Sequence, residues 1–340
     1  MHAALLAADA CAWPVLTHLA AGTLGLVYFN RPDHGRTEGD LAALVSRDDG
    51  ATWLAAGLPG PHEPGCNRMH LASGVDAAGR WLVFSTGMRV ADRQYLGLEP
   101  LWLSVCAAPG SAWTIDRSPR VELPETGAIP HGRIQTIPDG RLAATFYRSH
   151  GPGQPSRAWL ALSRNSGATW HAGGEIGAGD ANEIVLLPRA GADWLAVART
   201  HVDHHLALHR SNDGGATWQF QRDLTLPLQH PGDLTDLGAG RLLLTYGLRN
   251  RGLMGVGARL SRDGGATWGA PVVLYQFGEA TDCGYPSTVQ CTDGALLTAA
   301  YADLSPLHRG YHLLTLRWSL DEFFSPRPLG SVSDGRPLET

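Results

Sequence analysis

The sequence has few charged residues, no long apolar run and no cluster of basic side chains. Charged residues make up 17% of its 340 positions, and the 27 basic ones are scattered along the chain. Together with a net charge of −5, this composition argues against nucleic acid as a partner. No stretch approaches the roughly 18 consecutive apolar residues that a membrane-spanning helix needs, so no membrane partner is expected.

Cysteine is also scarce. The five cysteines form an odd set without a Cys-x-x-Cys pair. Neither a disulfide framework nor a zinc-thiolate site is indicated, and we expect buried reduced thiols, no metal and no cofactor. The first residues lack the basic and apolar segments of a secretory signal, which makes a cytoplasmic location the expectation.

Glycine, proline and tryptophan are abundant instead. The chain has 42 glycines, 22 prolines and 11 tryptophans, and 44% of its residues are hydrophobic. Many turns combined with ample core residues are typical of an all-β protein. No segment has the composition of a linker, so residues 1–340 are expected to form one domain, a length that repeat architectures often reach.

One eight-residue phrase occurs four times. It reads Ser-x-Asp-x-Gly-x-Thr-Trp at Ser46–Trp53, Ser211–Trp218 and Ser261–Trp268, and at Ser163–Trp170 with Asn165 in place of the aspartate. The acidic residue bonds backbone amides, the glycine takes a positive φ and the tryptophan packs against the next sheet, so each copy predicts a β-hairpin. Repeats of about 40–50 residues point to a propeller or solenoid.

A second repeat, two apolar strands joined by a glycine-containing turn, occurs six times. We expect these strand pairs at Trp13–Phe29, His70–Ser85, Arg133–Tyr147, Glu183–Arg199, Asp233–Tyr246 and Tyr285–Tyr301. Six such pairs predict a six-bladed β-propeller. The short strand Ala3–Ala8 is expected to pair with the last blade and close the ring, which removes the open edges.

The first residues of the inner strands are expected to crowd together at one mouth of the propeller channel. Many of them, and many residues of the loops after the paired strands, are charged or imidazole side chains that the fold does not require. Their concentration on one face of a weakly charged chain suggests a polar pocket for an anionic or polyhydroxylated ligand.

The eight-residue phrase is the Asp-box, or BNR repeat, of the sialidase (neuraminidase) superfamily, and the chain resembles this family over nearly its whole length. The box favours the fold more than the activity, because it also occurs in non-catalytic propellers. The resemblance implies an exo-acting glycoside hydrolase that releases a terminal acidic, sialic-acid-like sugar from a glycan with retention.

Tyr285, in the run Gly284–Ser287, stands where the family has its nucleophilic tyrosine, and Glu183 stands at the position of the partnering glutamate. Sialidases with a tyrosine nucleophile are an exception to the two-carboxylate rule of glycosidases. The anomeric carbon of a sialic acid carries a carboxylate that would repel an anionic nucleophile, whereas a neutral phenol can approach. A phenol with a pKa near 10 needs a base beside it, which is the role implied for Glu183.

Arginines at family positions imply a clamp for the sugar carboxylate. Arg199 follows Glu183 at a spacing that resembles the family's, and either Arg249 or Arg251 matches a second clamp residue. Guanidinium groups bind carboxylates bidentately, which suits an acidic sugar. Arg31, in the loop after the first strand pair, is a further candidate for substrate binding.

That loop also matches the location of the family's acid/base aspartate. Asp33 is the expected general acid that protonates the leaving oxygen. Glu38 is the next candidate, and Asp40 is more consistent with a strand edge.

The chain departs from the family pattern at the start of its first blade. Sialidases have Phe/Tyr-Arg-Ile-Pro there, and this arginine belongs to the carboxylate-binding triad, whereas this chain has the run Cys11–Pro14 without arginine. Either Arg68 or Arg133 replaces it, or the ligand differs from a standard sialoside. An unreplaced arginine would weaken carboxylate binding by a few kcal/mol, at about 1.5–3 kcal/mol per charged hydrogen bond.

Histidines keep other functions open. His70, His131 and His230 begin three inner strands and suit a glycosidase or polysaccharide lyase acting on another sugar, such as rhamnose or a uronic acid. His201, in the run 199–205, suits hydroxyl recognition or a general base better than a metal site, because alternate strand residues face opposite sides. A non-catalytic glycan-binding propeller is the third hypothesis.

Overall fold

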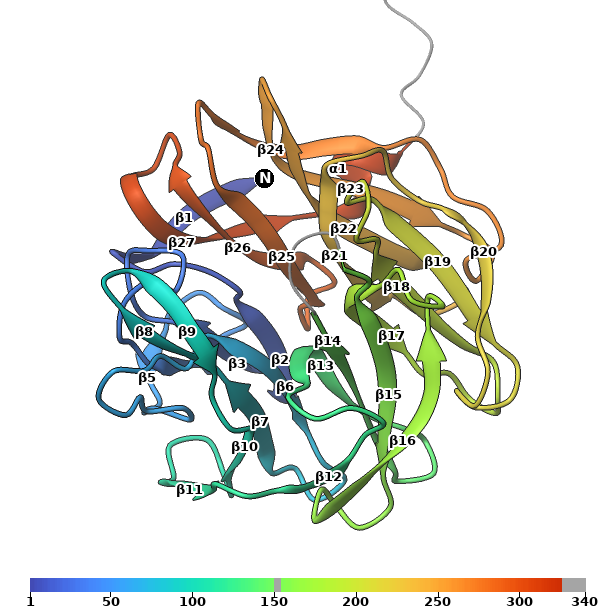
Figure 1. The fold of residues 1–340 in the computed structure, drawn as a ribbon. Helices are drawn as coiled ribbons and strands as arrows, with labels where there is room; N and C mark the ends of the chain where they lie inside the picture. Colours follow the sequence, from blue (N-terminus) through green and yellow to red (C-terminus); the bar gives the residue numbers. More distant parts are fainter. Residues whose placement is uncertain (150–153, 326–340) are drawn as a thin grey trace, which may run out of the picture.

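The strands form radial sheets around a common centre in the computed structural model, which describes residues 1–149 and 154–325 (Figure 1). Four of the sheets have four strands each. They consist of β2 (Val15–Ala20), β3 (Thr23–Phe29), β4 (Leu41–Ser46) and β5 (Leu54–Ala55); of β17 (Asn182–Leu187), β18 (Trp194–Arg199), β19 (Leu206–Ser211) and β20 (Gln219–Asp223); of β21 (Gln229–Asp236), β22 (Leu242–Asn250), β23 (Leu253–Ser261) and β24 (Val272–Gly278); and of β1 (His2–Ala8), β27 (Arg309–Trp318), β26 (Leu296–Leu304) and β25 (Cys283–Gln290).

A nine-stranded sheet completes the ring. A separate hairpin and one short helix, α1 (Leu320–Phe324), are added to it. The nine strands are β6 (His70–Val75), β7 (Trp81–Thr86), β10 (Trp102–Cys106), β11 (Trp113–Asp116), β12 (Arg120–Glu122), β13 (Ile129–Thr136), β14 (Leu142–Arg148), β15 (Arg157–Ser163) and β16 (Thr169–Ile176), and the hairpin is β8 (Met88–Ala91) with β9 (Gln94–Leu98).

All six expected strand pairs are present as antiparallel pairs: β2 with β3, β6 with β7, β13 with β14, β17 with β18, β21 with β22, and β25 with β26. They do not form six separate sheets, however. Two pairs are merged in the nine-stranded sheet, because β6 and β13 run in parallel and bond to each other. Gly74 makes this approach possible, since a Cβ there would lie 1.9 Å from the Ile134 carbonyl oxygen. The structure is therefore an all-β propeller with four separate blades and one merged sheet.

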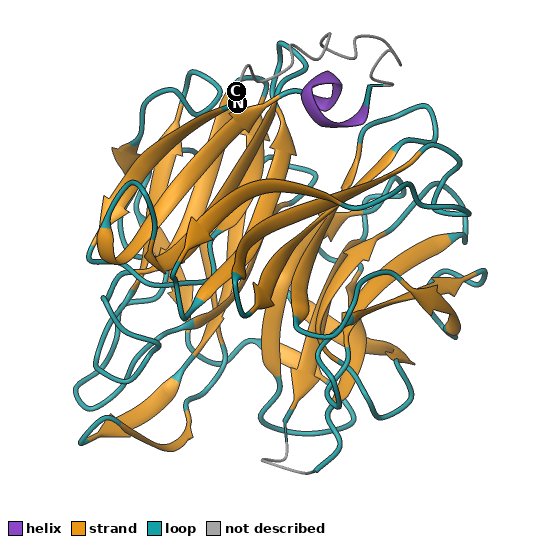
Figure 2. Cartoon of the chain, turned by 90° about the horizontal axis from the view of Figure 1, so that it is seen from above, coloured by secondary structure: helices purple, strands orange, loops and turns teal. Residues whose placement is uncertain are grey.

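The expected closure of the ring by the N-terminal strand is confirmed. β1 pairs with β27 from His2 opposite Arg317 to Ala8 opposite His312. The N-terminal amine also pairs with Glu322 of α1, and Figure 2 shows this helix beside the N-terminus. No helix within residues 1–149 and 154–325 is long and apolar enough to cross a membrane.

The four Asp-boxes form hairpin turns with one shared hydrogen-bond network. In the first, Gly50 N donates to Ser46 Oγ at 2.8 Å and Thr52 N donates to Asp48 Oδ1 at 2.8 Å. The other three boxes repeat both bonds, including the box that contains Asn165. The prediction that the phrase builds hairpins is confirmed, and the boxes lie away from the centre, where they hold strands together.

Candidate active site

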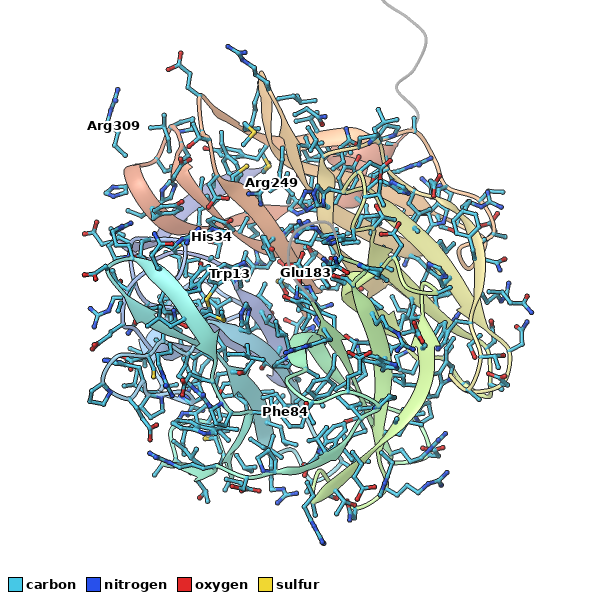
Figure 3. The ribbon with its side chains drawn as sticks, in the orientation of Figure 1. Trp13, His34, Phe84, Glu183, Arg249 and Arg309 are labelled. Carbon is cyan, nitrogen blue, oxygen red and sulfur yellow. The ribbon has the colours of Figure 1, made fainter. Side chains whose placement is uncertain are left out.

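A cavity of about 370 Å³ lies at the centre of the ring, where the inner strands begin. We call it the central cavity. Each of the six expected strand pairs contributes to its lining: Trp13, His70, Arg133, Glu183, Asp233 and Tyr285. Figure 3 shows Trp13, His34 and Glu183 near the middle of the ring. The expectation that these strand starts meet at one mouth of the channel is confirmed.

Tyr285 and Glu183 form a buried pair in the central cavity. The phenol donates to Glu183 Oε1 at 2.5 Å, and the two residues are only 9% and 7% exposed. Burial and the negative charge of Glu183 raise the pKa of Tyr285 well above 10, so the phenol is neutral at physiological pH. This arrangement places a neutral phenol beside a carboxylate that can accept its proton.

Local backbone geometry aims both side chains into the cavity. Glu183 has a φ of +41° and Tyr285 has a φ of +49°, values that cost a non-glycine residue about 1–3 kcal/mol. Each residue lies at a β-bulge, where the pairing of β17 with β18 and of β25 with β26 shifts register. A bulge turns a side chain out of the regular alternation. Strain of this kind is typical of functional sites.

Arg199 holds the other oxygen of the same carboxylate. Its Nη1 donates to Glu183 Oε2 at 2.6 Å, and its buried Nε has no hydrogen-bond partner among the described residues. Burial acts to raise the pKa of Glu183, but the charges of Arg199 and His131 and the Tyr285 hydrogen bond hold it well below its usual range. Glu183 is therefore an anion. It can accept a proton only when the charge of Arg199 or His131, or the hydrogen bond from Tyr285, changes.

Arg249 lies beside the central cavity but does not line it. Its guanidinium is bound to the carboxylate of Asp282 and, at 2.9 Å, to the carbonyl of Cys283. Asp282 also accepts hydrogen bonds from Tyr301 at 2.8 Å and Tyr311 at 2.9 Å. Burial acts to raise the pKa of Asp282, but these donors, His34 and Arg249 hold it well below its usual range.

Cys11, His34 and Asp282 could offer three ligand atoms to a metal, because these atoms lie within 4.8 Å of one another. Their chemistry fits a metal poorly. Burial raises the pKa of the Cys11 thiol far above 9, and the oxygens of Asp282 already accept four donors. A cation would have to displace Arg249, a cation itself, from the carboxylate.

His70 and His131 supply neutral imidazoles to the cavity wall. Burial lowers the pKa of His70 to about 4, and burial also lowers the pKa of His131. His230 does not line the cavity, and burial lowers its pKa to about 2. At neutral pH the imidazoles of His70 and His131 are therefore suited to hydrogen bonds with hydroxyl groups rather than to ion pairs.

Comparison with known proteins gives a family. A model of the BNR repeat-like domain matches residues 109–297, more than half of the chain. The chain belongs to the BNR repeat-like domain family. No curated protein matches it.

Solved structures share the fold of this BNR-repeat protein. A protein of unknown function from Dyadobacter fermentans has a TM-score of 0.76 at 19% identity, over 91% of this chain and 95% of that one. A Hadza microbial sialidase has a TM-score of 0.72 at 18% identity, over 91% of this chain and 65% of that one. The Trypanosoma rangeli sialidase has a TM-score of 0.64 at 15% identity, over 89% of this chain and 53% of that one. This chain therefore spans about half of that protein. The fold-level resemblance to sialidases is therefore confirmed.

Arg133 does not have a free guanidinium for a sugar carboxylate, which corrects its expected role. It binds Asp233 bidentately, at 2.6 and 2.7 Å, and also donates to the Thr288 carbonyl at 2.6 Å. Arg133 lines both the central cavity and a second cavity on the opposite side of the channel, whereas Asp233 lines the central cavity alone. Arg133 and Asp233 thus close the floor of the central cavity and join blades across the axis of the BNR-repeat ring.

Besides Arg249, three arginines and one histidine lie outside the lining of the central cavity, contrary to expectation. Arg68 is buried because its guanidinium stacks 3.5 Å from the Trp102 ring and donates to backbone carbonyls. Arg31 is exposed and bonds within its own loop, and Arg251 is exposed in the turn between β22 and β23. His201 lines a separate surface cavity.

The expected general acid, Asp33, is also outside the lining, whereas the next residue, His34, is part of it. The polar loop residues expected from the sequence at this mouth include His34 and Arg36, without a role for either, whereas Tyr95 was missed. The first two share the loop of Asp33, so the loop itself was a valid signal. Tyr95 comes from the β8–β9 hairpin, which no repeat or turn pattern in the sequence predicts.

Proposed function

We propose that the chain is a retaining exo-glycosidase of the sialidase type that releases a terminal acidic sugar. The observation that carries this proposal is the 2.5 Å hydrogen bond from the buried Tyr285 phenol to Glu183. Nucleophile and base within hydrogen-bond reach, with the base oriented by a third group, are the signature of covalent catalysis. Arg199 is that third group.

In the first step the Tyr285 oxygen attacks the anomeric carbon while its proton passes to Glu183. The bond to the leaving oxygen breaks, and that oxygen takes a proton from a general acid. In the second step water attacks the same carbon, the bond to Tyr285 breaks, and Glu183 returns the proton to the phenol. Two inversions at one carbon give retention.

A blind cavity supports an exo-acting enzyme. Its volume of about 370 Å³ lies at the small end of ligand pockets and suits one sugar residue. The Arg133–Asp233 pair closes the floor, so a glycan can enter by its end but cannot thread through the ring.

We also propose that the merged nine-stranded sheet corresponds to two blades of the propeller. The ring then has six blades, each with one inner strand at this cavity.

Arg199 and Arg36 are the proposed ligands of the sugar carboxylate. Both line the cavity; Arg199 has an unused Nε, and Arg36 lies 4.3 Å over the Tyr95 ring without a carboxylate partner among the described residues. In this proposal Arg36 serves in place of the arginine that the first blade lacks. Arg249 supports the site indirectly through Asp282.

A glycosidase acting on a neutral sugar is the second candidate. It is favoured by the internal pairing of Arg133 and Arg199 with carboxylates and by the two neutral imidazoles in the wall. In that case His70 and His131 would bind hydroxyl groups. A lyase acting on a uronic acid and a glycan-binding propeller without turnover remain as outcomes of the test.

The test is a panel of 4-nitrophenyl glycosides of acidic and neutral sugars, with unsaturated uronate products followed by ultraviolet absorbance. The proposal predicts hydrolysis of a 2-keto acid glycoside and its loss in Tyr285→Phe. A Tyr285→Phe variant with intact activity would refute the mechanism. Preference for a neutral glycoside would select the second candidate, and an ultraviolet-absorbing product would select the lyase.

A further inference from the structure

We propose that His34, oriented by Asp282, is the general acid and base at the leaving-group side of the central cavity. This inference rests on the proposed function and assigns the proton donor that it requires. It replaces Asp33, which the sequence favoured. The geometry of the loop between β3 and β4 carries the assignment.

The carboxylate of Asp33 is used to close its own loop. Its Oδ1 accepts from Arg36 N at 2.9 Å and its Oδ2 accepts from Thr37 Oγ1 at 2.7 Å. The residue is 7% exposed and does not line the central cavity. These bonds are those of a turn-forming aspartate, so Asp33 positions the residues that follow it.

His34 is the imidazole that this loop places in the lining of the cavity. It lines the cavity, and 40% of its side chain is exposed. The Trp13 ring meets the imidazole edge-on at 4.9 Å between centroids, and Tyr95 donates to the His34 carbonyl at 2.5 Å. Trp13 also meets Tyr285 edge-on at 6.0 Å, so the imidazole and the nucleophile flank the same indole.

Asp282 fixes which nitrogen of His34 is available. The Nδ1 atom lies 2.8 Å from Asp282 Oδ2, so it is the donor in that contact, and Nε2 has no hydrogen bond among the described residues. Asp282 is held in turn by Arg249, Tyr301 and Tyr311. A histidine oriented by a largely buried carboxylate, with its second nitrogen free of hydrogen bonds, is a general arrangement for proton transfer.

The proton balance is complete with these groups. When Tyr285 attacks, the bond from the anomeric carbon to the leaving oxygen breaks and that oxygen takes the proton from Nε2 of protonated His34. Neutral His34 then accepts a proton from the attacking water through Nε2. The water oxygen bonds to the anomeric carbon as the bond to Tyr285 breaks, and His34 is again protonated. Asp282 is a positioning residue and stays ionised.

The experiment compares His34→Gln with Asp33→Asn on two glycosides of the same acidic sugar. The 4-nitrophenyl glycoside has a good leaving group that needs little protonation, whereas the methyl glycoside has a poor one. His34→Gln is expected to lose about 10²–10⁴-fold in kcat on the methyl glycoside and far less on the 4-nitrophenyl glycoside. Asp33→Asn is expected to keep the wild-type ratio of the two rates.

Equal losses on both substrates in His34→Gln would overturn the assignment, as would the leaving-group dependence appearing in Asp33→Asn instead. Labelling with a 2,3-difluoro sugar acid separates this failure from that of the proposed function. Fluoride leaves without a proton, so His34→Gln should still be labelled at Tyr285. Absence of label on the wild-type protein would instead overturn the nucleophile, and His34 with it.

Discussion

Tyr285 and Arg199 bind the two oxygens of one carboxylate, that of Glu183. The phenol donates to Oε1 at 2.5 Å and the guanidinium donates to Oε2 at 2.6 Å. In the proposed mechanism this one buried charge both accepts the proton of Tyr285 and holds Arg199 in the wall of the central cavity. The proposed function therefore couples substrate binding and proton transfer through Glu183.

Glu183→Gln tests that coupling. The amide keeps the shape of the side chain but cannot take the proton of Tyr285, so kcat should fall by about 10²–10⁴-fold. Steady-state kinetics on the best aryl glycoside measure the effect. Glu175→Gln is the matched control, because it breaks a carboxylate–arginine pair with Arg157 away from the cavity. Similar kcat values in both variants would contradict the role of Glu183.

The fold was predictable where its signals are local. Asp-boxes and glycine turns specify hairpins through neighbouring residues, and all six strand pairs appear as expected. The merging of two blades was not predictable, because it depends on contact between Gly74 and Ile134, which are distant in sequence. The β8–β9 hairpin likewise interrupts the repeat, and no sequence pattern predicts it.

The site was predictable only in part, for a similar reason. The resemblance placed Tyr285 and Glu183 at equivalent strand starts, and the fold brings them together. Which arginines are free depends on tertiary partners that sequence position does not reveal. Arg133 is taken by Asp233 and Arg249 by Asp282, whereas Arg36 is not paired with a carboxylate within the described residues.

Arg36→Met tests the proposed carboxylate clamp. A charged hydrogen bond contributes about 1.5–3 kcal/mol, so KM for an acidic sugar substrate should rise about tenfold or more while kcat changes less. Arg309→Met is the control, since this exposed arginine lies at the periphery of the ring (Figure 3). A KM equal to that of the control would show that Arg36 does not bind the carboxylate.

The Arg133–Asp233 pair is expected to stabilise the ring. Arg133→Met leaves a buried carboxylate without its partner, which should lower the free energy of unfolding by about 3–5 kcal/mol. The double variant Arg133→Met/Asp233→Leu should recover part of the loss, because no charge is then left unpaired. Urea unfolding measures both. If Arg133→Met lowers the free energy of unfolding by only about 0–1 kcal/mol, as expected for a surface ion pair, the Arg133–Asp233 pair does not stabilise the ring as described.

The Asp-boxes predict a specific acid sensitivity. Hydrogen bonds from Thr217 and Ser211 lower the pKa of Asp213 from 3.8 to about 2. A pKa lowered by folding means that this carboxylate stabilises the fold above about pH 4 and loses that contribution as the pH falls toward 2. Asp213→Asn should therefore lower the melting temperature at pH 5 and converge with wild type near pH 2.

The box containing Asn165 provides the reverse comparison. Asn165→Asp should add a titrating group and steepen the loss of melting temperature between pH 4 and 2. Circular dichroism melts at several pH values follow both variants. Differences from wild type that stay constant across this pH range would contradict the account.

The mass of the protein after incubation with 2,3-difluorosialic acid tests the central claim most directly. The Trypanosoma rangeli sialidase was solved with this compound as a covalent intermediate. We predict one adduct per chain on the peptide that contains Tyr285, and none in Tyr285→Phe. Hydrolysis of an aryl sialoside without an adduct, or an adduct on another residue, would contradict Tyr285 as the nucleophile.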